Sequence, residues 1–284
     1  MISLVAEKRN QPTQPVTPDS SNTLTVATSS DWHIMHDRSK YFSPAQYKEL
    51  IRVMSDNADA IIVTGDIVDH PDPTNPQVAV DAAKAAAEVF AQASVPVILL
   101  LGNHDFNDGN PNAIAQILQD EGGAIVLDGQ SYVIEGVGIA GTKGMGGGFG
   151  TRRNRSDTMV GEPEYRRLTL ESEAENDKLA IALAQLTTAR KLVAVHYAPI
   201  TQTLEGEPVD LFNLLGSSQL EDIIDADGHV AAVVHGHAHH GSQEGHTQTG
   251  VPVYNVAIQV LDPQGVRARE FHPKNLFRQI VVEK

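Results

Sequence analysis

The sequence predicts an α/β fold in which most strands run parallel. Between residue 24 and about residue 122, a short apolar and β-branched run is followed three times by a loop and a helix. Each helix is expected to begin at a capping residue followed by proline, which suits the first helical position. Strands that alternate with helices in this way are typical of parallel sheets. The chain has 284 residues, 41% of them hydrophobic, which is enough for one large domain with a core.

The first half of the chain contains three strand–helix units. Their helices begin at Ser43-Pro44, Asn75-Pro76 and Asn110-Pro111. The expected elements are a strand at 25–28, a helix at 43–57, a strand at 60–64, a helix at 75–92, a strand at 97–101 and a helix from 110.

The second half of the chain has shorter elements. A G-x-G-x-x-G pattern at 136–141 is interpreted as a hairpin turn and strand, because no helix follows it as dinucleotide binding requires. The expected strands are 124–127, 132–135, 137–140, 192–195, 231–234, 253–260 and 279–282, and the expected helices are 171–186 and 219–225.

The domain organisation is expected to be simple. A flexible tail is expected at residues 1–23, because residues 7–23 are polar and rich in Pro, Thr, Gln and Ser. We find no linker that would divide residues 24–284, so a single domain is expected there. Glu7, Lys8 and Arg9 interrupt the apolar N-terminus, and no run is long enough to span a bilayer, which favours a cytoplasmic protein without a membrane anchor.

The overall composition excludes several kinds of chemistry. The 36 acidic and 21 basic residues give a net charge of −15, which disfavours binding to nucleic acid or to anionic lipid. There is no cysteine, so a disulfide, a thiolate nucleophile and a Cys-ligated zinc are all excluded. The composition does not indicate an oligomeric state.

Five polar segments follow predicted strands, where the ligand-binding loops of an open α/β sheet gather. Three of them begin with glycine, which is expected to let the backbone turn sharply so that the next side chain points inward. The segments are Asp31-Trp32-His33, Gly65-Asp66-Ile67-Val68-Asp69, Gly102-Asn103-His104-Asp105, His196 and Gly236-His237-Ala238-His239.

The residue types in these segments suit two divalent cations. Carboxylate, imidazole and amide oxygen without thiolate are typical ligands of Mn²⁺, Fe or Zn²⁺. Seven candidate ligands are too many for one tetrahedral zinc and suit two ions that share a carboxylate. Two such ions with Asp31, Asp66 and a bridging hydroxide leave a net charge of about +1, which attracts a phosphate ester.

The order D-x-H, G-D-x-x-D, G-N-H-D, H, G-H-x-H resembles the calcineurin-like metallophosphoesterase superfamily, from Asp31 to His239. The resemblance implies an α/β (α+β) fold, a four-layer sandwich of two facing mixed β-sheets flanked by helices. It also implies the roles of individual residues. Asp31, His33, Asp66 and His239 would hold one metal; Asp66, Asn103, His196 and His237 would hold the other, with Asp66 bridging. His104 would be the catalytic histidine, with Asp105 orienting its ring, and Asp69 is expected to hydrogen bond to the site rather than bind metal.

The function that follows is hydrolysis of a small-molecule phosphate ester by a hydroxide shared between the two metals. His104 would protonate the leaving group or stabilise charge on the phosphoryl oxygens. Phosphodiesters are the expected substrates, with phosphomonoester or protein phosphatase activity as the alternative. A second alternative is a non-catalytic protein-binding scaffold on the same fold, but such scaffolds typically lose ligands that this sequence retains.

A glycine-rich basic loop is expected at residues 141–167. It contains six basic and three acidic residues, a local surplus of +3 in an acidic chain. One interpretation is a solvated surface loop. The alternative is a flap that brings Arg152 and Arg153 to the phosphate of the substrate.

Overall fold

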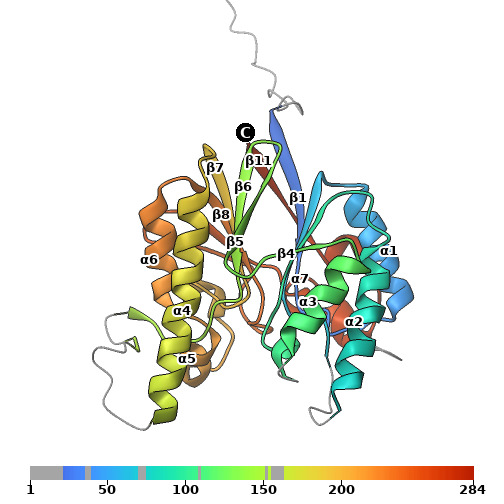
Figure 1. The fold of residues 1–284 in the computed structure, drawn as a ribbon, viewed down its shortest axis with the longest axis horizontal. Helices are drawn as coiled ribbons and strands as arrows, with labels where there is room; N and C mark the ends of the chain where they lie inside the picture. Colours follow the sequence, from blue (N-terminus) through green and yellow to red (C-terminus); the bar gives the residue numbers. More distant parts are fainter. Residues whose placement is uncertain (1–21, 36–39, 70–74, 108–109, 151–152, 155–162) are drawn as a thin grey trace, which may run out of the picture.

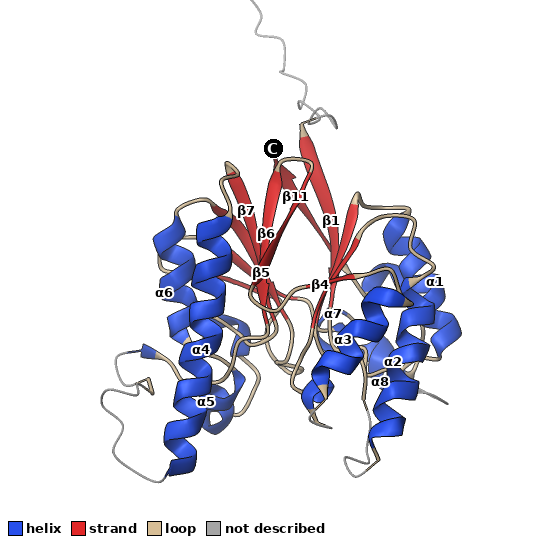
Figure 2. Cartoon of the chain, in the orientation of Figure 1, coloured by secondary structure: helices blue, strands red, loops and turns tan. Residues whose placement is uncertain are grey.

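Two β-sheets pack face to face, and helices cover their outer faces (Figure 1). The computed structural model describes residues 22–35, 40–69, 75–107, 110–150, 153–154 and 163–284. The fold has four layers in the order helix, sheet, sheet, helix. Figure 2 shows the strands in the middle with helices on both sides. This arrangement confirms the predicted fold class. The predicted N-terminal tail lies almost entirely outside the described residues, and the first strand begins at Thr23.

The first sheet has the strand order β11-β1-β2-β3-β4. Strands β1, β2, β3 and β4 are parallel. The edge strand β11 pairs antiparallel with β1, so the sheet is mixed. Helices α1, α2 and α3 connect the parallel strands and pack on the outer face. The bounds are β1 (Thr23–Ser29), α1 (Pro44–Ser55), β2 (Ala60–Thr64), α2 (Pro76–Phe90), β3 (Val97–Leu100), α3 (Pro111–Asp120), β4 (Ile125–Val126) and β11 (Arg278–Glu283).

The second sheet has the strand order β5-β6-β7-β8-β10-β9. Its inner strands β6, β7, β8 and β10 are parallel, and the two edge strands run antiparallel to their neighbours. Helices α4 and α6 cover its outer face. The bounds are β5 (Gln130–Ile134), β6 (Val137–Thr142), α4 (Pro163–Gln185), β7 (Arg190–Val195), α6 (Ser218–Asp227), β8 (Val230–His235), β9 (Glu244–His246) and β10 (Pro252–Asn255).

Short helices complete the chain. They lie mainly in the loops that follow the strands. Their bounds are η1 (His104–Phe106), η3 (Gln202–Leu204), η4 (Val209–Leu211), α5 (Phe212–Leu215), α7 (Ile258–Leu261), α8 (Pro263–Ala268) and η5 (Pro273–Asn275). No helix among the described residues is both long and apolar enough to cross a bilayer.

Strand side chains alternate between two apolar layers. In β2, Ile62 faces the layer between the sheets, whereas Ile61 and Val63 face helices α1 and α2. In β7, Leu192 faces the intersheet layer and Val193 faces α4 and α6. Because both faces of each parallel strand are buried, these strands are continuous apolar runs rather than alternating ones.

The predicted helix starts are confirmed at all three proline pairs. The Ser43 hydroxyl accepts from the Gln46 backbone N–H, and the Gln46 side chain accepts from the Ser43 backbone N–H, which completes a capping box. Asn75 and Asn110 cap α2 and α3 in the same position. These caps satisfy backbone donors that a helix start otherwise leaves unpaired.

Two expected elements were wrong in extent. The strand predicted at 253–260 ends at Asn255, and the chain leaves the sheet so that Ile258 begins α7 and packs against the first helical layer. An apolar run alone does not distinguish a buried strand from a short buried helix. The helix predicted from residue 171 begins at Pro163, where an Arg167–Glu171 pair of 3.0 Å supports the added turns. Both ends of the loop expected at 141–167 were wrong: residues 141–142 belong to β6 and residues 163–167 belong to α4.

The intersheet layer should be the most sensitive part of the core. Ile62 is fully buried there, so Ile62→Ala should lower the free energy of unfolding by about 2–5 kcal/mol. Ile181→Ala is the matched control, because Ile181 lies on α4 with 56% of its surface exposed and should change stability little. Denaturant unfolding of both variants measures the difference, and equal stabilities would contradict this description of the core.

Candidate metal centre

The predicted site residues lie at one edge of both sheets. Asp31 and His33 follow β1, Asp66 follows β2, and Asn103 and His104 follow β3. His196 follows β7, and both His237 and His239 follow β8 of the second sheet. Because parallel strands present their carboxyl ends at the same edge, residues that are far apart in sequence meet there.

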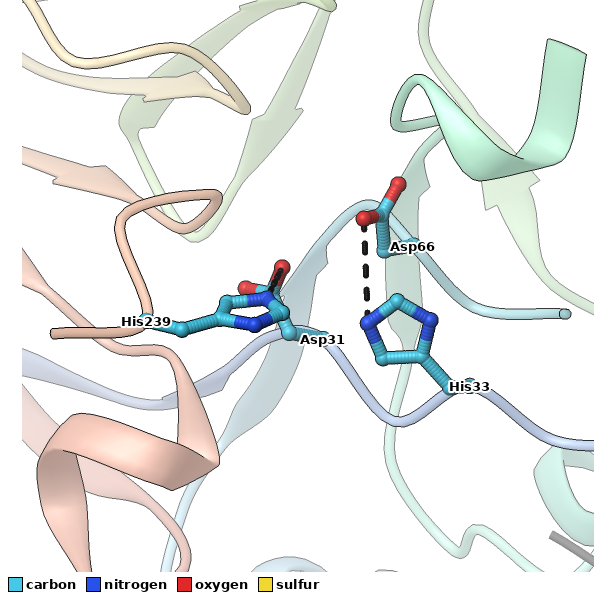
Figure 3. Close-up of side chains that lie close together, drawn as sticks. All are labelled: Asp31, His33, Asp66 and His239. Atoms are coloured by element: carbon cyan, nitrogen blue, oxygen red, sulfur yellow. Dashed lines mark hydrogen bonds and ion pairs between the residues drawn. The ribbon is translucent and has the colours of Figure 1, made fainter. Parts of the chain in front are cut away.

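A first group of side chains contains Asp31, His33, Asp66 and His239 (Figure 3). One candidate ligand atom from each lies within 4.8 Å of those from the other three. The Asp31 Oδ1 atom is 2.8 Å from Nε2 of His239, and Asp66 Oδ2 is 3.8 Å from Nε2 of His33. Three of the four side chains are buried, and these four donors are the right number and kind for one cation.

A second group contains Asp66, His196 and His237, with Asn103 beside them. Nε2 of His196 is 3.3 Å from Asp66 Oδ1 and 3.0 Å from Asn103 Oδ1. The other ring nitrogen of His196, Nδ1, is 2.8 Å from the Thr64 carbonyl oxygen. Donation from Nδ1–H to this carbonyl leaves the Nε2 lone pair facing the carboxylate and amide oxygens, which is the usual arrangement of a metal-binding histidine.

Some buried polar atoms of the site lack a hydrogen-bond partner in the part of the chain that the structure describes, and cations would satisfy them. Both Asp31 and Asp66 are buried, and burial together with the Asp31 charge raises the pKa of Asp66 well above its usual range. Nε2 of His33 is buried and has no hydrogen-bond partner among the described residues. Such unpaired groups are costly unless a ligand completes them. The residues present therefore fit two divalent ions.

Burial favours the neutral form of three proposed histidine ligands, His33, His196 and His237, because it lowers the pKa of each. Burial lowers the pKa of His33 and of His237 to about 4. Burial also lowers the pKa of His196 well below its usual range. Neutral imidazoles have a free lone pair at neutral pH, so they can bind a cation without first losing a proton.

The contact expected between Asp105 and His104 is made by Asp69 instead. Asp69 Oδ1 is 3.2 Å from Nδ1 of His104, and Asp69 Oδ2 is 3.5 Å from Nδ1 of His33. Asp105 accepts backbone N–H groups of Ile67, Val68 and Gly102, at distances from 2.7 to 3.3 Å. Its carboxylate thus joins the loops after β2 and β3. Adjacency in sequence suggested Asp105, but η1 turns that side chain toward the backbone.

Four of the proposed ligands have strained backbone conformations. Asp31, His33, Asp66 and His237 have φ values of 63°, 49°, 47° and 69°. Non-glycine residues in this left-handed region cost of order 1–3 kcal/mol each and persist where the surrounding structure fixes them. Backbone bonds from Asp31 N to the Gly65 carbonyl (3.1 Å) and from His33 N to the Asp66 carbonyl (3.0 Å) hold these loops together.

The glycines that begin the motifs are needed mainly because there is no room for a side chain, and less because of their backbone conformation. Only Gly65 has a positive φ, of 103°, so the expected sharp turn applies to that glycine alone. A side chain at Gly102 would collide with the Asp66 carboxylate, and one at Gly236 would collide with Ser30 and Asp31. These glycines let neighbouring loops approach closely enough to place the ligands.

The structure adds residues that the motifs did not indicate. Gln259 Nε2 donates to the Asp31 carbonyl at 3.1 Å, and the Tyr197 ring centroid lies 4.2 Å from that of His237. Position next to His196 was the only sequence signal for Tyr197, and Gln259 had none.

Of the two loop arginines predicted to contact the substrate, the structure describes one, Arg153, and it contacts α6 rather than the metal-binding groups. Arg152 lies outside the described residues. Arg153 Nη2 donates to Asp222 at 2.6 Å and Nη1 donates to Ser218 at 3.4 Å, so this guanidinium is directed toward α6. A partly exposed ion pair of this kind is worth little, about 1 kcal/mol or less.

The fold and the site define a metal-binding hydrolase of the α/β class. The sequence model of the calcineurin-like phosphoesterase family matches residues 24–241 of this chain. The chain belongs to this family, and it is a metallophosphoesterase that hydrolyses phosphoric esters. A comparison with curated protein sequences finds no match.

Solved structures share the fold at low sequence identity. A phosphopantetheinyl hydrolase from Mycobacterium tuberculosis has a TM-score of 0.61 and 15% identity, over 90% of this chain and 95% of that one. A dimetal phosphatase from Danio rerio has a TM-score of 0.60 and 13% identity, over 93% of this chain and 94% of that one. At these identities the similarity establishes the fold alone.

The close approach at Gly102 provides a test of the site. In Gly102→Ala the added methyl group would displace the Asp66 carboxylate, so metal content after reconstitution with Mn²⁺ should fall by about one ion or more per chain. Gly228→Ala is the control: Gly228 has φ of 71° but open space around it, so this variant should lose stability and keep its metal. Elemental analysis measures the content, and full occupancy in Gly102→Ala would contradict the packing argument.

Proposed function

We propose that this site holds two divalent cations that share Asp66. The first would be bound by Asp31, His33, Asp66 and His239, and the second by Asp66, Asn103, His196 and His237. The observation that carries the proposal is the position of Asp66, whose Oδ1 faces His196 at 3.3 Å while its Oδ2 faces His33 at 3.8 Å. Imidazole, carboxylate and amide donors favour Mn²⁺ or Fe, with Zn²⁺ as a further candidate.

The reaction proposed for this site is hydrolysis of a phosphodiester. When bound, the cations would lower the pKa of a shared water and neutralise charge on the phosphate oxygens. The ester would lie between residues that follow strands of both sheets. The protein holds the carboxylates of Asp31 and Asp66 in fixed positions. Support for a diester comes from two separate cavities, one lined by His237 and the other by His239, because a diester has two arms to place. A phosphomonoester or phosphoprotein has only one ester arm and is the alternative substrate.

His104 is proposed as the residue that transfers a proton to the leaving group or stabilises the phosphoryl oxygens. Its ring Nε2 lies 3.9 Å from Asp66 Oδ2, at the edge of the metal site, and 31% of its side chain is exposed. Its backbone N–H donates to Asp66 Oδ1 at 2.9 Å, which fixes the position of the residue. Asp69 holds Nδ1, so Nε2 is left to face a substrate.

Removing the shared carboxylate should empty both sites. Asp66→Asn keeps the shape of the side chain but removes the charge between the two groups, so reconstituted protein should contain well under one ion per chain instead of about two. Asp56→Asn, an exposed residue at the end of α1, is the control and should keep full occupancy. Elemental analysis with Mn²⁺ provides the measurement, and two ions in Asp66→Asn would remove the bridging assignment.

Replacing His104 should reduce catalysis without removing metal. We expect His104→Ala to lower kcat by roughly 10²–10⁴, the usual contribution of a general acid–base group. The loss should shrink for nitrophenyl esters, whose leaving groups need little protonation. Asp69→Asn should lower kcat less, because it only loosens the ring. His229→Ala, at an exposed position next to β8, is the control.

The measurement is kcat and metal content with Mn²⁺ on alkyl and nitrophenyl phosphodiesters, phosphomonoesters and cyclic nucleotides. Equal losses for alkyl and nitrophenyl esters would favour stabilisation of the phosphoryl oxygens over proton transfer. Unchanged kcat in His104→Ala would contradict both roles.

A further inference from the structure

Two cavities open beside the metal centre, and they differ in chemical character. One, of about 600 Å³, is lined by His239 together with residues 40–41 and residues of α7 and α8. The other, of about 400 Å³, is lined by His237 together with residues of α4 and α5. They have no lining residue in common. Figure 2 shows α8 on the side of α2 and α4 and α5 on the opposite side, so the cavities lie on different flanks of the site.

The cavity beside His239 is cationic. Lys40, Arg267 and Arg269 line it, and none of its lining residues is an Asp or a Glu. Within the described part of the chain, neither arginine forms an ion pair, and Lys40 pairs with Asp69 at 3.9 Å and lies over the Tyr41 ring. All three side chains are exposed, so water and salt screen their mutual repulsion, but an anion in the cavity would be attracted by each of them. This is an unusual feature in a chain of net charge −15.

The backbone fixes one of these cations in place. Arg269 ends α8 in the left-handed region with φ of 59°, a position that glycine usually takes. The Glu270 N–H donates to the Gly265 carbonyl at 2.8 Å and the Arg269 N–H to the Val266 carbonyl at 3.3 Å, which closes the end of the helix. The Arg269 side chain therefore starts from a defined point at the cavity.

The cavity beside His237 is apolar. Its lining residues include no Asp, Glu, Lys or Arg. Tyr165, Leu168 and Leu214 are 62%, 39% and 58% exposed, so large apolar side chains face solvent next to a proposed metal ligand. The Tyr197 ring packs against His237 at the inner end of this cavity. Exposed apolar side chains that gather around a concave site are typical of a binding surface.

We propose that the substrate is a phosphodiester with two unlike arms. The apolar arm lies in the cavity beside His237, and the other arm, which ends in a carboxylate or a phosphate, lies in the cavity beside His239. The phosphorus lies between them, where the ligands of both proposed cations meet. This inference rests on the proposed function, because it assigns the arms of the diester that the site hydrolyses. A monoester would leave one of the two cavities unused.

The test compares three esters that share a 4-nitrophenyl arm. The second arm is butyl, 3-carboxypropyl or 3-phosphonooxypropyl, so the three esters share a propylene chain and differ in its terminal group, which is methyl, carboxylate or phosphate. Wild-type protein reconstituted with Mn²⁺ should hydrolyse one or both charged esters with a kcat/KM about five- to tenfold above that for the butyl ester, the effect of a partly exposed charged contact. The comparison between the two charged esters distinguishes carboxylate from phosphate.

Two double variants locate the arms. Arg267→Gln with Arg269→Asn should remove the preference, so that with this variant kcat/KM for the charged esters falls to its value for the butyl ester; asparagine tolerates the left-handed conformation. Leu168→Asn with Leu214→Asn should lower kcat/KM about fivefold or more for all three esters, because all carry the nitrophenyl arm. The controls are Arg52→Gln with Arg190→Gln, and Ile181→Asn, all at exposed positions outside both cavities.

The outcomes separate this inference from the proposed function. If wild-type protein hydrolyses the butyl ester and both charged esters equally well, the arm assignment is wrong while the phosphodiesterase proposal stands. An unchanged preference in the arginine variant, or unchanged kcat/KM in the leucine variant, overturns the corresponding arm. If metal-loaded protein hydrolyses none of the three esters, the phosphodiesterase proposal itself fails, and this inference fails with it.

Discussion

The Asp66 carboxylate is buried at the edge where the two sheets meet, and the geometry of the whole site depends on it. It faces His33, which follows a strand of the first sheet, and His196, which follows a strand of the second. The adjoining backbone N–H of His104 fixes one of its oxygens. A buried carboxylate without a positive partner is expensive, and the cations proposed for this site would supply that partner.

Rigid sheets make this arrangement possible. The proposed ligands Asp31, His33, Asp66 and His237 have strained backbones, and such strain persists only when the surrounding structure fixes the chain. Strands buried on both faces provide that support, because their side chains fill the intersheet layer and the helical layers at once. Asp105 connects the loops after β2 and β3 by accepting three backbone N–H groups, so its contribution is positional.

Local charge and overall charge have opposite signs in this protein. The chain carries −15, yet the cavity beside His239 is lined by three cations and by no carboxylate side chain. Two cations at the metal centre would add further positive charge. The surface as a whole therefore repels anions, whereas the site attracts them over a short range where screening is weakest. An apolar cavity on the other flank gives the site two chemically distinct sides.

The sequence by itself determined the family, the parallel strand–helix units and the candidate ligands, because these depend on local signals: proline pairs at helix starts, apolar runs and polar motifs directly after them. Tertiary structure alone decided which carboxylate contacts His104: adjacency in sequence favoured Asp105, but the Asp105 side chain accepts backbone N–H groups and Asp69 contacts the ring. It also decided that Gly102 and Gly236 are needed for close packing, that residues 256–261 leave the sheet, and that Arg153 faces α6. The two cavities are formed by residues from distant segments, and only their packing in three dimensions brings those residues together.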